Sequence, residues 1–131
     1  MLDHIGLVVK DIKKAKAFYK KALAPLGLEL IFEVTPRQSG NGTAHAGFGE
    51  AAKPYFWIGT AAKRRPASRA HISFTAPDRA AVDAFHKAAL KAGGKDNGKP
   101  GLRPHYHPNY YGAFVIDLDG NNIEAVCHKP A

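Results

Sequence analysis

Two short segments of the chain, residues 4–9 and 71–76, alternate large apolar side chains with polar or small ones. The apolar positions are Ile5, Leu7 and Val9 in the first segment, and Ile72, Phe74 and Ala76 in the second. Successive side chains of a β-strand point to opposite faces of the sheet. Each segment therefore predicts a strand with one face against the core and a polar or small opposite face.

A helical pattern follows each of these strands. Asp11 and Asp78 are positioned to cap the helix N-termini, because a carboxylate accepts hydrogen bonds from free backbone N–H groups. The apolar stripes at helical spacing are Ala15, Phe18, Ala22 and Leu23 in the first helix, and Val82, Phe85, Ala89 and Leu90 in the second. Gly27 and the pair Gly93–Gly94 suit the left-handed turn that ends a helix.

The two halves of the chain are copies of one another at an offset of 67 residues. His4–Ile5 then aligns with His71–Ile72, Asp11 with Asp78, Ala17–Phe18 with Ala84–Phe85, Lys20 with Lys87, Ala22–Leu23 with Ala89–Leu90, and Gly27 with Gly94. The matches include a helix cap, core aromatic residues and a glycine at the helix end, and the alignment needs no gap. A repeat of this kind predicts two copies of one supersecondary unit.

Three more strands are expected in each half. In the first half they are roughly residues 28–34, 43–48 and 55–58, and the segment 36–42 between the first two is expected to be a loop. In the second half the first of these strands is poorly marked after Gly94, whereas residues 111–117 and 122–127 are clear. The pair Asp119–Gly120 between them is a strong hairpin signal.

The sequence thus predicts an α+β fold with two βαβββ modules. At 131 residues the chain fits a single domain: module one spans residues 1–60, a linker spans 61–69, and module two spans 70–128. The helices are expected to cover the apolar face of the sheet. The opposite face carries His4, Gly6 and Val8 with His71, Ser73 and Thr75, which suits the wall of a pocket better than a core.

Composition narrows the class of protein. Apolar residues make up 45% of the chain, as in an ordinary globular protein, and no apolar run is long enough to span a membrane. The N-terminus shows no signal-peptide pattern, and the single cysteine, Cys127, cannot form an internal disulfide, so a reducing cytoplasm is expected. Most lysines near the first helix lie away from its apolar stripe, and the densest basic run, residues 63–65, lies in the linker. We therefore expect no nucleic-acid partner despite the formal charge of +8.

Three side chains on the polar face are candidate metal ligands. His4 and His71 begin equivalent strands, and Glu124 alternates with the apolar Ile123 and Ala125, so it lies on the face opposite to them. Two imidazoles and one carboxylate suit Fe(II), Zn, Mn or Ni and leave coordination positions for substrate or water. Single His and Glu residues in such places are more often ordinary hydrogen-bonded side chains. The repeat and the strand parity favour metal binding slightly over that interpretation.

The segment 103–111 is a second candidate site. It concentrates one arginine, two histidines, three tyrosines and two prolines, and an ordered surface loop explains it as well as a lip over the pocket does. In the second interpretation, Arg103, His105 and Tyr106 bind substrate, and Arg103 holds an anionic group. His107 is a candidate general base and Tyr111 a candidate donor, although the pattern leaves open which tyrosine faces inward.

The chain resembles the vicinal oxygen chelate superfamily of glyoxalases, extradiol dioxygenases and bleomycin-resistance proteins. The resemblance covers essentially the whole chain. It is carried by a first strand opening with His4, a capped helix with Phe18 and a downstream Gly27, and a closing Asp-x-Asp-Gly-Asn-x-x-Glu motif that ends at Glu124. It implies one curved, cup-shaped sheet with helices on its outer face and a divalent metal ion in the cup. The metal positions carried over are His4, His71 and Glu124.

One position departs from the glyoxalase pattern. Glyoxalase I uses a fourth protein ligand from the last strand of the first half, and the position equivalent to Glu124 there is Trp57, which cannot coordinate a metal. A His/His/Glu set is similar to that of the extradiol dioxygenases, which are usually longer chains. Trp57 also suits the metal-free relatives that bind drugs in an aromatic cup.

Two functions follow from the resemblance. The first is a metal-dependent enzyme, a lyase or isomerase or an extradiol-type dioxygenase, acting on a small oxygen-rich molecule. The second is a metal-free protein that sequesters a drug or an aromatic metabolite, with Trp57 as a binding residue. In both cases the partner is a small molecule, and the resemblance implies a homodimer, although two modules are expected to close one cup within a single chain.

Overall fold

The computed structural model describes residues 1–63 and 69–131. The predicted linker 61–69 and the basic run 63–65 therefore lie partly outside the described residues. No helix in the described part of the chain has the length and apolar character needed to cross a membrane.

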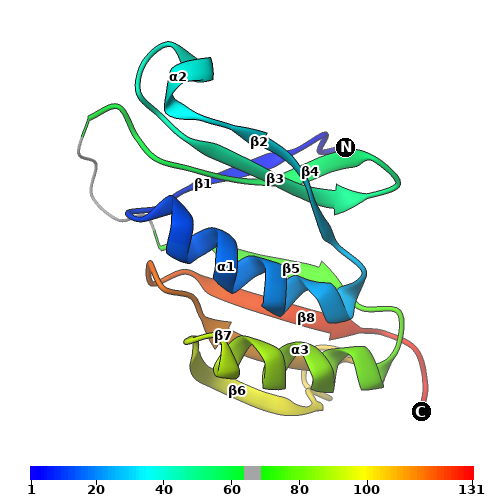
Figure 1. Cartoon of the computed structure of the whole chain (residues 1–131). Helices are drawn as coiled ribbons and strands as arrows, with labels where there is room; N and C mark the ends of the chain where they lie inside the picture. The colour runs from blue at the N-terminus through cyan, green and yellow to red at the C-terminus, as the bar shows by residue number, and fades with distance from the viewer. Residues whose placement is uncertain (64–68) are drawn as a thin grey trace.

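The structure confirms two βαβββ modules in an α+β fold (Figure 1). The first contains β1 (Ile5–Val8), α1 (Ile12–Leu23), β2 (Glu29–Val34), β3 (His45–Glu50) and β4 (Lys53–Gly59), with a short 3₁₀ turn, Ala24–Leu26, after α1. The second contains β5 (His71–Thr75), α3 (Arg79–Lys91), β6 (Lys95–Leu102), β7 (Tyr111–Ile116) and β8 (Asn122–Cys127).

Each module forms its own four-stranded sheet. The strand orders are β1-β4-β3-β2 and β5-β8-β7-β6, with β1–β4 and β5–β8 parallel and the remaining pairs antiparallel. The register reproduces the sequence repeat, since Gly6 pairs with Trp57 as Ser73 pairs with Glu124. In each sheet the first strand of the module is an edge strand. The expected closure of one cup within a single chain is not observed.

The helices begin and end where the sequence indicates. Asp11 accepts a hydrogen bond from the Lys14 amide, and Asp78 accepts one from the Ala81 amide, as N-cap residues do. Gly27 follows the first helix in the left-handed conformation with φ of 86°, which is why a residue without Cβ is needed there.

One local prediction is corrected, and one weakly marked strand is confirmed. The segment expected to be only a loop contains a one-turn helix, α2 (Pro36–Ser39), because Thr35 and Gln38 form a capping box and Pro36 occupies the first helical position. The poorly marked strand is β6, an edge strand whose pairing with β7 shifts register on both sides of Gly98. Its glycines and proline hide the strand in the sequence, while backbone hydrogen bonds to β7 maintain it.

The two modules share one hydrophobic core. The apolar sides of both sheets and the apolar stripes of α1 and α3 form a single cluster of buried side chains. α1 packs against α3 as well as against its own sheet, and Figure 1 shows the two helices running beside each other. Phe56 of β4 meets Phe74 of β5 with ring centroids 5.2 Å apart. The faces with the candidate site residues therefore point away from this core.

A buried hydrogen bond joins α1 to the β7–β8 turn. The Tyr19 hydroxyl donates to the Asp117 carboxylate, and both side chains are almost fully buried. Burial, followed by the charge of Asp117, raises the pKa of Tyr19 well above its ordinary value, so this phenol stays a neutral donor.

Replacing Tyr19 should weaken the contact between the modules. We expect Tyr19→Phe to lower the free energy of unfolding by about 1–3 kcal/mol, because the buried Asp117 loses a donor that water cannot replace. Tyr111→Phe is the matched control, since its hydroxyl donates to the exposed Asp83 and its loss should cost less. Urea denaturation followed by circular dichroism measures both. Equal losses in the two variants would contradict the role given to the buried bond.

Candidate functional site

Strands β5, β7 and β8 bring three polar side chains together on the outer face of the second sheet. Glu124 is 1% exposed, and its carboxylate accepts hydrogen bonds from two side chains. One is His71, whose Nε2 lies 2.9 Å from Glu124 Oε2, and the other is the Tyr110 hydroxyl. The His71 imidazole is 54% exposed. A buried carboxylate thus holds an accessible imidazole at the surface of the sheet.

Tyr110 reaches Glu124 because β7 has a glycine beneath it. A Cβ at Gly112 would lie 3.2 Å from the Tyr110 ring and 3.3 Å from Glu124 Oε1. Burial, followed by the hydrogen bond to Glu124, raises the pKa of Tyr110 to about 12. Tyr110 is therefore a neutral donor at physiological pH. We name His71, Glu124 and Tyr110 the Glu124 cluster.

Aromatic rings of the second candidate segment pack beside Tyr110 of the Glu124 cluster. The Tyr106 ring lies 5.1 Å from the Tyr110 ring, and the His105 ring lies tilted against Tyr106 at 4.2 Å. The His107 ring lies 5.7 Å from that of His128, which in turn contacts Tyr110, and His107 Nδ1 accepts a hydrogen bond from the Asn109 amide. The segment thus reaches Glu124 through Tyr110.

Arg103 and Tyr111 differ in their relation to the cluster. Arg103 lies over the Phe114 ring at 5.6 Å and donates to the Lys99 carbonyl, and Phe114 in turn lies 6.2 Å from His71. Tyr111 turns toward α3 instead, where its hydroxyl donates to Asp83. The tyrosine whose hydroxyl contacts Glu124 is thus Tyr110, whereas the hydroxyl of Tyr111, the residue predicted to be the donor, bonds to Asp83.

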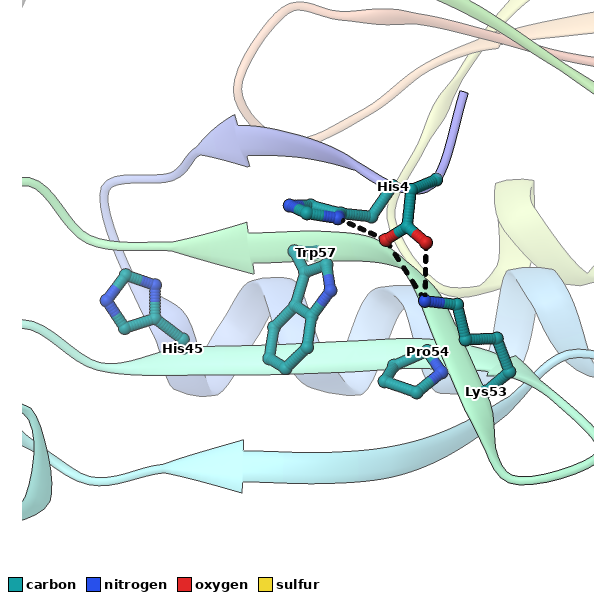
Figure 2. A pocket seen from close by; sticks show the side chains of 6 residues that line it. His4, His45, Lys53, Pro54 and Trp57 are labelled. Carbon is teal, nitrogen blue, oxygen red and sulfur yellow. Dashed lines mark hydrogen bonds and ion pairs between the residues drawn. The ribbon is translucent and has the colours of Figure 1, made fainter. Parts of the chain in front are cut away.

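The first sheet carries a separate candidate site. Figure 2 shows His4, His45, Trp57, Pro54 and Lys53 around a cavity of about 350 Å³, which Asp3 also lines. His71 lines a different cavity, which borders Asn122 and Gly120. No three His, Cys, Asp or Glu side chains in the described residues lie close enough together to share a metal ion. The structure therefore unites His71 with Glu124 but does not bring His4 to them within one chain.

The side chains of the Glu124 cluster supply two of the ligand atoms that a metal site needs. The His71 Nε2 and the Glu124 Oε2 lie 2.9 Å apart, and an imidazole nitrogen and a carboxylate oxygen are donor types that Fe(II), Mn, Ni and Zn bind. His4 has the features of a ligand on its own sheet, because Asp3 accepts from its Nδ1 at 2.7 Å and Lys53 binds Asp3 in turn. A carboxylate on one ring nitrogen leaves the other, Nε2, free as a ligand.

Three other residues lie as follows. Cys127 is buried. His86 is buried on α3, where its Nε2 lies 2.9 Å from Asp96 Oδ1. His45 lines the cavity beside Trp57. The inward positions of Tyr110 and His45 could have been found in the sequence from Gly112 and Gly59, because these side chains lie over the two glycines.

A family model describes nearly all of the chain. Residues 1–125 match the model of the Glyoxalase/Bleomycin resistance protein/Dioxygenase superfamily. No curated protein sequence matches the chain significantly.

Solved structures share the fold. A glyoxalase/bleomycin resistance protein from Albidiferax ferrireducens T118 is 27% identical, with a TM-score of 0.76 and 97% of each chain covered. A mutant of glyoxalase I from Zea mays is 22% identical, with a TM-score of 0.72, and the match covers 95% of this chain but 46% of the maize chain.

A third similar structure is a mutant of the fosfomycin resistance protein FosX from Listeria monocytogenes, complexed with Mn(II) and 1S,2S-dihydroxypropylphosphonic acid. It is 21% identical, with a TM-score of 0.66 and coverage of 96% of this chain and 88% of that one. The match to the family model spans far more than half of the sequence, and both the module topology and these structures agree with it. The chain therefore belongs to the Glyoxalase/Bleomycin resistance protein/Dioxygenase superfamily.

Proposed function

We propose that this protein binds a divalent metal ion through His71 and Glu124 of one copy and His4 of a second copy, and acts on a small oxygen-rich molecule there. The observation that carries the proposal is the Glu124 cluster. Its carboxylate is 1% exposed and is paired with the accessible His71 imidazole, so one carboxylate oxygen and one imidazole nitrogen lie together near the surface of the second sheet, as two ligands of one ion would.

A second copy is needed because the donors of one chain are divided between two sheets. β1 and β5 are edge strands, so each can lie beside a strand of another molecule. Ile5 and Val8 on β1 are 39% and 44% exposed, which is unusual for the apolar residues of a short strand. A homodimer that pairs β1 of one copy with β5 of the other joins the two candidate faces. The match covers less than half of the maize glyoxalase I chain, which agrees with a complete unit larger than one copy of this chain.

Each polar side chain near this joint site has a proposed role. A bound metal ion would supply Lewis acidity to adjacent oxygens of the ligand. Tyr110 orients the Glu124 carboxylate and remains protonated. We assign proton exchange with a bound ligand to His107 or His105, and the binding of an anionic group to Arg103. A lyase, isomerase or extradiol-type reaction is compatible with this set, and cytoplasmic location remains an expectation.

The second candidate is a metal-free protein that sequesters a drug or an aromatic metabolite. The specific observation in its favour is Trp57, which occupies on the first sheet the register position that Glu124 occupies on the second. Metal analysis separates the two functions.

We expect the purified protein to bind about one divalent metal ion per chain. Glu124→Gln should weaken binding by more than the 10–100-fold that is usual for losing an outer-shell partner, because a ligand itself is lost. Isothermal titration with Mn(II), Fe(II), Ni(II) and Zn(II) measures the affinity, and Glu29→Gln is the control at an exposed carboxylate. Unchanged affinity in Glu124→Gln would exclude the metal site and leave the metal-free function.

Tyr110→Phe tests the orienting hydrogen bond. We expect metal affinity to fall by roughly 10–100-fold with unchanged stoichiometry, because Glu124 keeps its charge but loses the donor that fixes its position. Tyr111→Phe is the matched control and should bind metal normally, since its hydroxyl faces α3. Equal affinities for the two variants would show that Tyr110 does not act on the site.

Mixing two inactive variants tests the joint site. His4→Ala and His71→Ala should each bind little metal alone, whereas a refolded mixture should recover binding in the heterodimer, which contains one complete set of ligands. A mixture of His71→Ala with Glu124→Gln is the control, because both defects fall on the same face and no intact set can form. Recovery in neither mixture would place all ligands in one chain, or show that they do not form a site.

A further inference from the structure

The cavity beside Trp57 has the features of a site for a flat ring. We call it the Trp57 trough; its lining residues are Asp3, His4, His45, Lys53, Pro54 and Trp57. Its volume of about 350 Å³ lies within the range of small-molecule sites. Figure 2 shows the indole between His45 at one end and Pro54 and Lys53 at the other.

Glycines form the floor of the trough. A Cβ at Gly47 would lie 2.9 Å from Cη2 of the Trp57 indole, so a side chain there would displace the ring. A Cβ at Gly59 would likewise lie 2.3 Å from His45 Nδ1. The sequence thus has no side chain at the two positions over which the indole and the imidazole rest. The indole thus rests on the sheet at Gly47, and it is half-buried and lines the cavity.

Neighbouring side chains hold the indole in this orientation. The Phe32 ring meets it edge-to-face at 6.1 Å and is itself 54% exposed. Pro54 lies at the far end, where its Cβ is 2.9 Å from the Cβ position of Gly47. Aromatic rings stack favourably on an exposed indole face, with about 0.5–1.5 kcal/mol beyond the area they bury. The trough therefore favours a planar aromatic ligand over an aliphatic one of equal size.

The hydrogen bonds of His45 fix its tautomer. The Thr43 hydroxyl donates to Asn41 Oδ1 at 2.6 Å, so its oxygen is left to accept from His45 Nε2, 2.9 Å away. In the neutral ring the proton is then on Nε2, and Nδ1 is an acceptor. Nδ1 is the nitrogen that lies over Gly59, on the side of the ring toward Trp57 (Figure 2). Among the described residues Nδ1 has no hydrogen-bond donor, so a ligand O–H or N–H at this end of the trough can pair with it.

At the opposite end of the trough, the charges of Lys53 and Asp3 are paired with each other. Lys53 Nζ lies 2.9 Å and 3.0 Å from the two carboxylate oxygens of Asp3, which also accepts from His4. The ammonium and the carboxylate neutralise one another, so an anionic ligand would have to break an existing ion pair.

We infer that the Trp57 trough binds an uncharged planar aromatic ring that stacks on the indole and donates a hydrogen bond from a ring hydroxyl or N–H to His45 Nδ1. This inference deepens the second proposed function and rests on the first sheet being used for small-molecule binding. The trough shares His4 with the proposed metal site but contains neither Glu124 nor His71, and the contacts inferred here are those of Trp57 and His45.

Trp57 reports on the inference directly because it is the only tryptophan in the chain. Its fluorescence, and the single indole N–H resonance of ¹⁵N-labelled protein, should respond to phenol titrated in the presence of EDTA. Phenol should bind about 5–10-fold more tightly than methoxybenzene, which lacks the donor, as expected for one hydrogen bond. Cyclohexanol, which has the donor but no aromatic face, should bind more weakly than phenol.

Two variants assign the contacts. His45→Ala should reduce phenol affinity about 5–10-fold and leave methoxybenzene affinity unchanged, because only phenol uses Nδ1. Gly47→Ala should weaken both aromatic ligands, because it displaces the indole. His86→Ala, on the far side of the core, is the control for a general loss of histidine.

The phenol titration and the metal titration can fail independently of each other. Equal affinity for phenol and methoxybenzene, or no response of Trp57 to either, would overturn the inference even if metal titration supports the Glu124 cluster. Discrimination by His45 in a protein that binds no metal would support the inference and favour the metal-free function.

Discussion

The rest of the structure depends on the buried carboxylate of Asp117. It accepts hydrogen bonds from the backbone amides of Asp119 and Asn121, from the Asn121 side chain and from the Tyr19 hydroxyl. The first three bonds close the turn between β7 and β8, and the fourth ties that turn to α1 of the other module. A buried carboxylate is tolerated only when its oxygens accept hydrogen bonds. The four donors to Asp117 therefore fix the position of the β7–β8 turn relative to α1.

This network also positions the candidate site. Asn121 Oδ1 accepts from the Ala70 amide, and the Ala70 carbonyl accepts from the Asn122 amide, so the starts of β5 and β8 are held side by side. His71 follows Ala70 directly, and Glu124 is two residues beyond Asn122. The His71–Glu124 distance is therefore set by backbone pairing that the Asp117 turn anchors. Because Tyr19 belongs to the same network, the packing of the modules and the geometry of the site are coupled.

The sequence predicted those features that local chemistry encodes. The 67-residue repeat, the Asp11 and Asp78 caps and the Asp119–Gly120 hairpin each reflect contacts between residues near in sequence. Strand parity placed Glu124 and His71 on one face, as the structure confirms. The choice between Tyr110 and Tyr111 was not predictable, because it depends on Gly112 making room across two strands. Strand β6 was obscured because its pairing with β7, not its own side chains, maintains it.

The largest difference between expectation and structure concerns how the halves meet. A pseudo-twofold repeat suggested that His4 and His71 face one cup, but it does not say which faces of the two sheets are buried together. The apolar stripes of α1 and α3 decide this, since they join the helix sides of both sheets around Phe56 and Phe74. That packing sends both polar faces outward. The accessible His71 imidazole, the Trp57 indole and the β1 and β5 edges therefore lie where a ligand or a second copy can reach them.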